Sequence, residues 1–250
     1  MCFDRVCRRA VVAGLLLLFT LASCTVKEDR DHCPCLLTLE LQDLPEWPVY
    51  YSILEDGQVL YEGTAPQDTT IAVTVPRTGV EVRALAGSPE NARIPYGDQS
   101  PPLYLYRRQV ETRADGIKVR PQLRKHFCTL SLEVNAPPGN GTPYWTQVRG
   151  QVDGIDPDGK PLSGDFACRL VPGGQVRLPR QHPSDALWLD IVMPDGILRT
   201  FSLGACILES GYDWTAPDLT DLSLELQLSV SLLRLQWDGW SRSVPLSLEI

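Results

Sequence analysis

Apolar and polar residues alternate in several stretches of this chain, and the alternation decides which fold it can adopt. In the longest stretch, residues 222–230, every second residue is Leu or Val and the residues between are Ser, Glu or Gln. Shorter stretches of this kind cover residues 37–41, 71–75 and 130–134. Successive side chains of a β-strand point to opposite faces of a sheet, so each stretch predicts a strand with one buried and one solvated face.

Turn signals separate the expected strands. Asp-Gly pairs stand at residues 56–57, 158–159 and 195–196, and this dipeptide favours the positive φ of tight hairpin turns. The 21 prolines and 19 glycines interrupt the chain too often for long helices, and no window shows a convincing helical period. We therefore expect an all-β chain, with a long loop at Gly87–Pro102, where prolines are frequent.

A basic run near Arg120–Lys125 follows one turn signal and precedes a fresh apolar stretch. We place a domain boundary there, which predicts an N-terminal β-sandwich over residues 35–124 and a C-terminal one over residues 125–250. Each half would hold enough strands for two packed sheets. A single large β-domain is the alternative.

The N-terminus has the features of a bacterial lipoprotein export signal. Three arginines precede an apolar run that is too short to span a bilayer, and the segment ends in Leu21-Ala22-Ser23-Cys24. We expect residues 1–23 to be removed, Cys24 to carry acyl chains such as palmitate, and residues 24–34 to form a tether. A short N-terminal membrane helix is the alternative.

The tether and the net charge bear on location and partners. Residues 27–31 are all charged and resemble the export signal of surface lipoproteins of Bacteroidota, although a charge run is also typical of a solvated linker. The formal charge of the chain is −8, and loss of residues 1–23 makes it more negative because they hold more arginine than acid. Nucleic acid is therefore excluded as a partner, since phosphate binding depends on Lys and Arg.

Five cysteines remain in the expected mature chain beyond Cys24, an odd number that leaves at least one thiol without an intramolecular partner. An exported protein can form disulfides. The Cys-Pro-Cys sequence at 33–35 lacks the ligand spacing of a zinc site. We interpret the five as structural cysteines, buried or disulfide-linked: Cys33, Cys35, Cys128, Cys168 and Cys206.

No catalytic motif is present in the sequence. The three histidines, His32, His126 and His182, share no metal-ligand spacing, and nucleophile-elbow, metalloprotease and phosphate-loop patterns are missing. The acidic stretch 153–159 suggests calcium, but its spacing favours a plain hairpin turn. We therefore expect no enzyme activity, no metal and no cofactor.

Six tryptophans leave two interpretations open. Exposed indole rings can stack on sugars, whereas tryptophan in a β-sandwich more often fills the core. We expect mostly core positions, with Trp145, in the loop sequence Pro-Tyr-Trp at 143–145, as the exposed exception.

Two short regions resemble the fimbrillin-associated anchor lipoproteins (FimB/Mfa type) of Bacteroidota. At the start, Cys24 and the charged tether run into Cys33-Pro34-Cys35-Leu36; at the end, residues 218–222 lead to Trp237 and Trp240. The resemblance implies two transthyretin-like β-sandwich domains and a surface-exposed lipid anchor in the outer membrane. It also implies a role in cell adhesion as an anchor or accessory subunit of a type V pilus, with fimbrillin shaft subunits as partners.

The pilus resemblance directs attention to the C-terminus, because such shafts assemble by adding a strand to a neighbour's sheet. Residues 244–250 alternate again, and we interpret them as a strand that either donates to the first shaft subunit or closes the second domain. The candidate donor side chains are Val244, Leu246, Leu248 and Ile250. The alternative function is a surface glycan-binding lipoprotein of a polysaccharide uptake system, which requires exposed aromatic rings in a groove.

Overall fold

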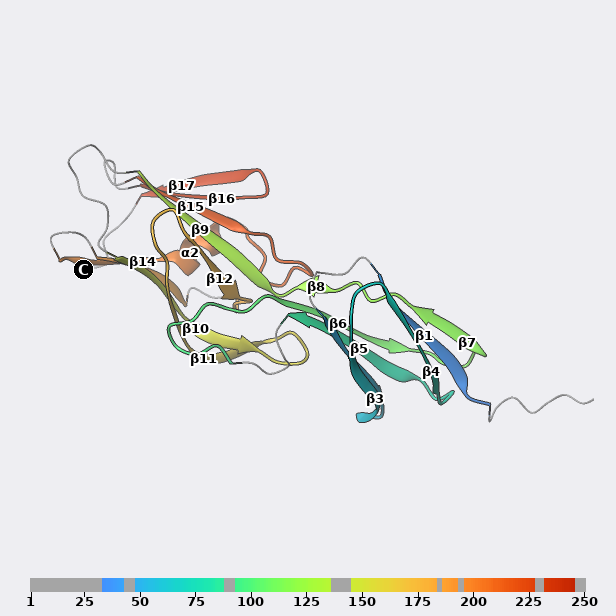
Figure 1. Ribbon diagram of the computed structural model, residues 1–250. Helices are drawn as coiled ribbons and strands as arrows, with labels where there is room; N and C mark the ends of the chain where they lie inside the picture. The colour runs from blue at the N-terminus through green and yellow to red at the C-terminus, as the bar shows by residue number, and fades with distance from the viewer. Residues whose placement is uncertain are drawn as a thin grey trace, which may run out of the picture.

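The structure is a computed structural model that describes residues 33–42, 48–87, 93–135, 145–183, 186–192, 196–227 and 232–245. The export signal, Cys24 and most of the tether lie outside these ranges. The described part is almost entirely β-structure, which confirms the predicted fold class. Figure 1 shows two groups of sheets arranged end to end, with β8 at the place where they meet.

The first group consists of a three-stranded and a five-stranded sheet, in the orders β4-β1-β7 and β3-β2-β5-β6-β8. Alternate residues of β1 are fully buried, as the leucine alternation predicted. They form a core with β2 and β5. The strands are β1 (Cys35–Leu41), β2 (Val49–Glu55), β3 (Gln58–Ala65), β4 (Thr69–Val75), β5 (Val80–Gly87), β6 (Leu103–Val110), β7 (Gly116–Val119) and β8 (Arg124–Lys125).

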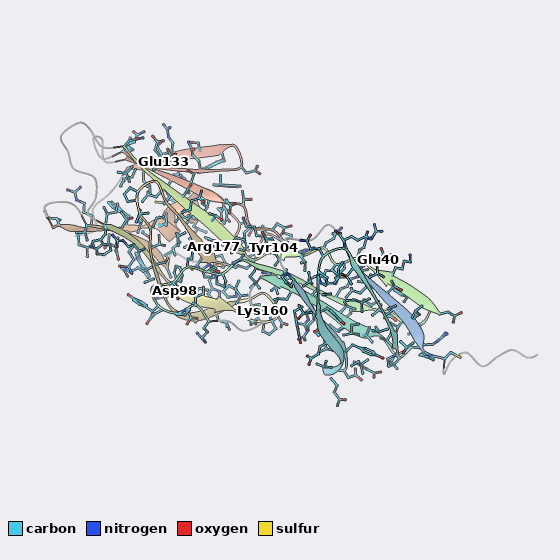
Figure 2. All side chains as sticks on the ribbon, in the orientation of Figure 1. Glu40, Asp98, Tyr104, Glu133, Lys160 and Arg177 are labelled. Carbon is cyan, nitrogen blue, oxygen red and sulfur yellow. The ribbon has the colours of Figure 1, made fainter. Side chains whose placement is uncertain are left out.

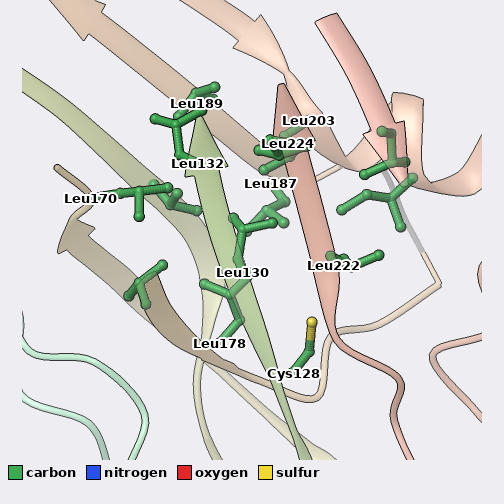
Figure 3. Packing of buried hydrophobic residues seen from close by; sticks show 14 of the residues in the cluster. Cys128, Leu130, Leu132, Leu170, Leu178, Leu187, Leu189, Leu203, Leu222 and Leu224 are labelled. Carbon is green, nitrogen blue, oxygen red and sulfur yellow. The ribbon is translucent and has the colours of Figure 1, made fainter. Parts of the chain in front are cut away.

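The second group consists of a four-stranded and a five-stranded sheet, in the orders β11-β10-β13-β14 and β12-β9-β15-β16-β17. Its own core of buried leucines lies between the two sheets, as Figure 3 shows. The strands are β9 (Phe127–Asn135), β10 (Trp145–Ile155), β11 (Pro161–Arg169), β12 (Gln175–Pro179), β13 (Leu187–Val192), β14 (Leu198–Ser202), β15 (Leu222–Gln227), β16 (Leu232–Trp237) and β17 (Trp240–Pro245).

Each group therefore has two facing sheets and a separate hydrophobic core. The β8 strand pairs with β6 of the first group, and β9 begins the second group two residues later. That the two groups are independent domains divided between residues 124 and 125 stays a prediction.

One short helix was not predicted. The α2 helix (Leu203–Glu209) follows β14 and buries Leu203 and Ile207 in the second core. Two turns are too short to produce a periodic pattern over an eleven-residue window, so the helix depends on packing rather than on an amphipathic sequence. In the described ranges, no helix has the length and apolar character needed to cross a bilayer.

The stretch 87–102 was expected to be a plain loop, and its described part, residues 93–102, packs against the second group. The side chain of Ile94 is buried in the second core. Its backbone N–H donates to the carbonyl of Asp153 on β10, and further along Ser100 N–H donates to the carbonyl of Arg177 on β12. This segment of the first half therefore closes the side of the second sandwich between β10–β11 and β12.

Candidate functional site

The C-terminal hairpin, β16 and β17, is the candidate site for a partner strand. An Asp-Gly pair at 238–239 makes its turn, with φ of 43° and 74°, the two positive values that a type I′ hairpin requires. This pair is the same turn signal as the Asp-Gly pairs at 56–57 and 158–159. Because β17 is the last strand of its sheet, one side of its backbone has no partner strand within the described part of the chain.

Aromatic packing fixes the hairpin on the second core. Trp237 stands edge-on to Tyr212, with ring centroids 5.5 Å apart, and its Nε1 donates to Oγ of Ser210 at 3.2 Å. The Tyr212 hydroxyl donates to the carbonyl of Thr220 at 2.6 Å. Burial raises the pKa of Tyr212 above its usual range, and the neighbouring thiol of Cys128 adds to this effect.

A second contact holds β17 to the end of α2. Arg242 on β17 donates to the backbone carbonyl of Glu209 at 2.9 Å and forms an ion pair with its carboxylate at 3.2 Å. Both side chains are about half exposed, so this pair adds little to stability. It orients the edge strand relative to the helix.

The structure describes only part of the predicted donor segment. Val244 lies in β17, where its backbone pairs with Leu233 of β16, and Pro245 pairs with Leu232. Leu246, Leu248 and Ile250 lie outside the described residues, as does the lipidation candidate Cys24. The choice between a closing strand and a donor strand for residues 246–250 stays a prediction.

The predicted structural cysteines all fall within the described ranges and are free thiols there. Cys33 is exposed, Cys206 is half-buried and the other three are buried. Burial raises the pKa of the Cys128 thiol to about 12 and also raises those of Cys35, Cys168 and Cys206. Thiols with raised pKa values are poor nucleophiles.

The described tryptophans lie mainly against the second core. Trp214 is buried, and Trp237 and Trp240 pack on the core from its edge. Trp188 is half-buried under the guanidinium of Arg149, 4.7 Å from its ring centroid. Trp145, the expected exception, is half-buried on β10 at the edge of a hollow of about 440 Å³ that it shares with Gly97, Gln147 and Arg169.

The acidic stretch 153–159 forms the turn between β10 and β11. Asp156 accepts backbone N–H groups of residues 158 and 160 through Oδ1, at 2.9 and 2.8 Å. Gly159 has a φ of 79°. This is the hairpin turn that the sequence predicted.

Three solved structures share the fold along nearly their whole length. A proposed polysaccharide-binding protein of Bacteroides thetaiotaomicron has a TM-score of 0.63 and 11% identity, and the match covers 84% of this chain and 98% of that one. The fimbrial anchor protein Mfa2 of Porphyromonas gingivalis has a TM-score of 0.56 and 11% identity, with coverage of 84% and 99%. A fimbrial assembly protein of Parabacteroides distasonis has a TM-score of 0.54 and 10% identity, with coverage of 86% and 99%.

No protein-family model and no curated protein matches the sequence. The likeness therefore rests on the arrangement of strands, because identities of 10–11% carry little residue-level information. The resemblance that the two ends of the sequence indicated is confirmed at the level of the fold: this chain has the fold of the fimbrial anchor and assembly proteins of Bacteroidota.

Proposed function

We infer that this chain is an anchor or accessory subunit of a type V pilus that binds the first fimbrillin shaft subunit. The observation that carries the inference is the likeness of fold to Mfa2, a fimbrial anchor protein, over almost all of that protein. Several fold neighbours are described as adhesins and fimbrial proteins, which agrees with a role in assembly and cell adhesion, and one is described as a proposed polysaccharide-binding protein.

Strand complementation is the binding mode that the C-terminus supports. A strand added to a sheet gains a ladder of main-chain hydrogen bonds, while alternate side chains fill pockets of the acceptor. The β17 edge carries such a ladder on one side only, and residues 246–250 continue the alternation beyond it. We propose that residues 246–250 extend from β17 and enter the sheet of the first shaft subunit.

Attachment to the outer membrane is part of the same proposal. The lipid on Cys24 would hold the chain on the outer leaflet, with the charged tether separating it from the first sandwich. Two acyl chains give stable anchoring, since each buried CH₂ contributes about 0.8 kcal/mol. A subunit held in this way can retain a polymer that has no membrane segment of its own.

The test is capture of a shaft subunit from detergent-solubilised outer membrane by tagged, lipidated protein, with identification by mass spectrometry. Deletion of residues 246–250 spares every described ladder pair of β17, so the variant should fold and lose capture. Serine in place of Leu246, Leu248 and Ile250 should have the same effect. The matched control replaces Ser247 and Glu249 with alanine and should retain capture.

Loss of folding in the deletion variant, or capture that survives it, would contradict strand donation. Capture that fails even in the unmodified protein, with no fimbrillin-like subunit recovered, would contradict the pilus role itself.

A glycan-binding lipoprotein is the second candidate function. Two observations favour it: a proposed polysaccharide-binding protein shares the fold, and Trp145 borders a hollow together with Gln147 and Arg169, which could contact a sugar. The buried or core-packed positions of Trp214, Trp237 and Trp240 weigh against a broad aromatic platform. Recovery of a TonB-dependent transporter or of bound glycan in the same experiment would favour this function over the pilus role.

A further inference from the structure

A cavity of about 860 Å³ lies where the two sandwiches meet, within the size range of ligand sites. Its walls come from both halves: β6 and the residues before β9 on one side, and the β10–β11 turn, residues 180–183 and residues 214–217 on the other. In Figure 2, Lys160 of the β10–β11 turn lies at this junction.

The charge of the cavity is opposite to that of the protein. The chain carries a net charge of −8, yet five cationic side chains and a single carboxylate, Asp158, line this space. Arg107 forms an ion pair with Asp158 and another with Glu81. Arg108, Arg124 and Lys160 form no ion pair within the described part of the chain. A cleft lined by charge of one sign concentrates ligands of the other sign.

Arg180 adds a positive charge that forms no salt bridge with the described residues, although the carboxylates of Asp213 and Asp218 act on it electrostatically. The side chain is buried, with 7% of its surface exposed. Its guanidinium donates to the backbone carbonyls of Trp214 at 2.5 Å and Ala216 at 2.8 Å, and to His126 Nδ1 at 3.2 Å. Carbonyls solvate this charge, and Asp213 and Asp218, which do not line the cavity, offset part of it. The positive potential of the cavity therefore depends mainly on the cations that line it.

The other residues that line the cavity are either apolar or polar without a charge. Four prolines offer flat apolar surface, and Gln122, Gln181 and Thr215 offer amide and hydroxyl groups. An inorganic anion would form ion pairs with the cations but would not contact the prolines or the amide and hydroxyl groups. A neutral sugar would contact these groups but form no ion pair with the cations. A molecule that combines a ring bearing hydroxyl groups with a carboxylate uses both.

We propose that the cavity between the sandwiches binds an acidic saccharide, with Arg108, Arg124 and Lys160 as the groups that recognise its carboxylates. This site lies apart from the C-terminal strand. The proposal goes beyond the pilus role and does not depend on capture of a shaft subunit.

The test measures binding of trigalacturonic acid to the mature lipidated protein in detergent micelles by isothermal titration calorimetry, with the neutral trisaccharide of galactose as the comparison. We expect the acid to bind at least ten times more tightly than the neutral sugar, with an affinity that falls as salt rises. Replacing Arg108, Arg124 and Lys160 together with glutamine should weaken binding of the acid at least tenfold. The control, Arg113→Gln, changes a cation that is 88% exposed and does not line the cavity, and should leave binding unchanged.

Equal binding of acidic and neutral sugars, no binding of either, or an unaffected triple variant would overturn the proposal. A triglutamate peptide that binds more tightly than the sugar acid would also overturn it and indicate a protein partner. Capture of a shaft subunit by the triple variant should be unaffected.

Discussion

Arg180 donates a hydrogen bond from Nε to Nδ1 of His126 over 3.2 Å. An imidazole nitrogen accepts only when it carries no proton, so this contact requires that Nδ1 be unprotonated. Burial first, and the positive charge of Arg180 second, lower the pKa of His126 to about 4. His126 is therefore neutral at neutral pH, and the positive potential of the cavity comes from its arginines and lysine.

This histidine should make the protein sensitive to mild acid. The unfolded chain binds a proton at His126 near pH 6.5 and the folded chain only near pH 4, so the stability contributed by the neutral imidazole is present above pH 6.5 and is lost as the pH falls to 4. The linked free energy is at most about 3 kcal/mol. Urea unfolding at several pH values should show this loss in the unmodified protein and a smaller loss in His126→Gln. Equal pH dependence in both proteins would contradict it.

Ile94 should contribute to the stability of the second sandwich although it belongs to a loop of the first half. Its side chain is 5% exposed within the second core. Ile94→Ala should lower the free energy of unfolding by about 2–4 kcal/mol, as is usual for large-to-small core changes. Tyr96→Ala, in the same segment but 73% exposed, should change it by less than about 0.5 kcal/mol. Equal effects in denaturant titrations would mean that the segment does not pack as described.

Gly159 should tolerate a side chain worse than Gly57 does. Both glycines occupy hairpin turns, with φ of 79° and 81°. A Cβ on Gly159 would lie 2.5 Å from Cε1 of His126, whereas one on Gly57 would meet nothing within 4 Å. Gly57→Ala should therefore destabilise by about 1 kcal/mol through its backbone alone, and Gly159→Ala by more than that. Melting temperatures of the two variants provide the comparison, and a larger loss at Gly57 would refute it.

The five thiols should differ in their reactivity. Cys33 is exposed, whereas Cys128 is fully buried with its pKa raised to about 12. Since the thiolate is the reactive form, iodoacetamide should label Cys33 in the native protein and leave Cys128 unlabelled until denaturant is added. Peptide mass spectrometry before and after unfolding measures this. Rapid native labelling of Cys128 would show that the second core opens readily.

The sequence predicted the strands in which apolar and polar residues alternate, because the alternation shows which side chains are buried. Leu37 and Leu39 of β1, and Leu222 and Leu224 of β15, are all buried as their period of two indicates. The alternation does not identify a strand that is exposed on both faces: Val59 on β3, the end strand of its sheet, is 53% exposed. The short α2 helix also escaped prediction, since tertiary packing holds it.

The sequence by itself determined the class of fold, the strands that contain residues 37–41, 71–75, 130–134 and 222–227, and the turns at the Asp-Gly pairs 56–57 and 158–159, because side-chain direction and backbone φ are local properties. The predicted turn at 195–196 lies partly outside the described residues. Only the tertiary structure decided that Ile94 fills the second core, that Arg180 is buried against backbone carbonyls, and that cations from β6, β8 and the β10–β11 turn line one cavity. These relationships join residues far apart in the chain. They depend on how two sandwiches pack end to end, which no local pattern of residues encodes.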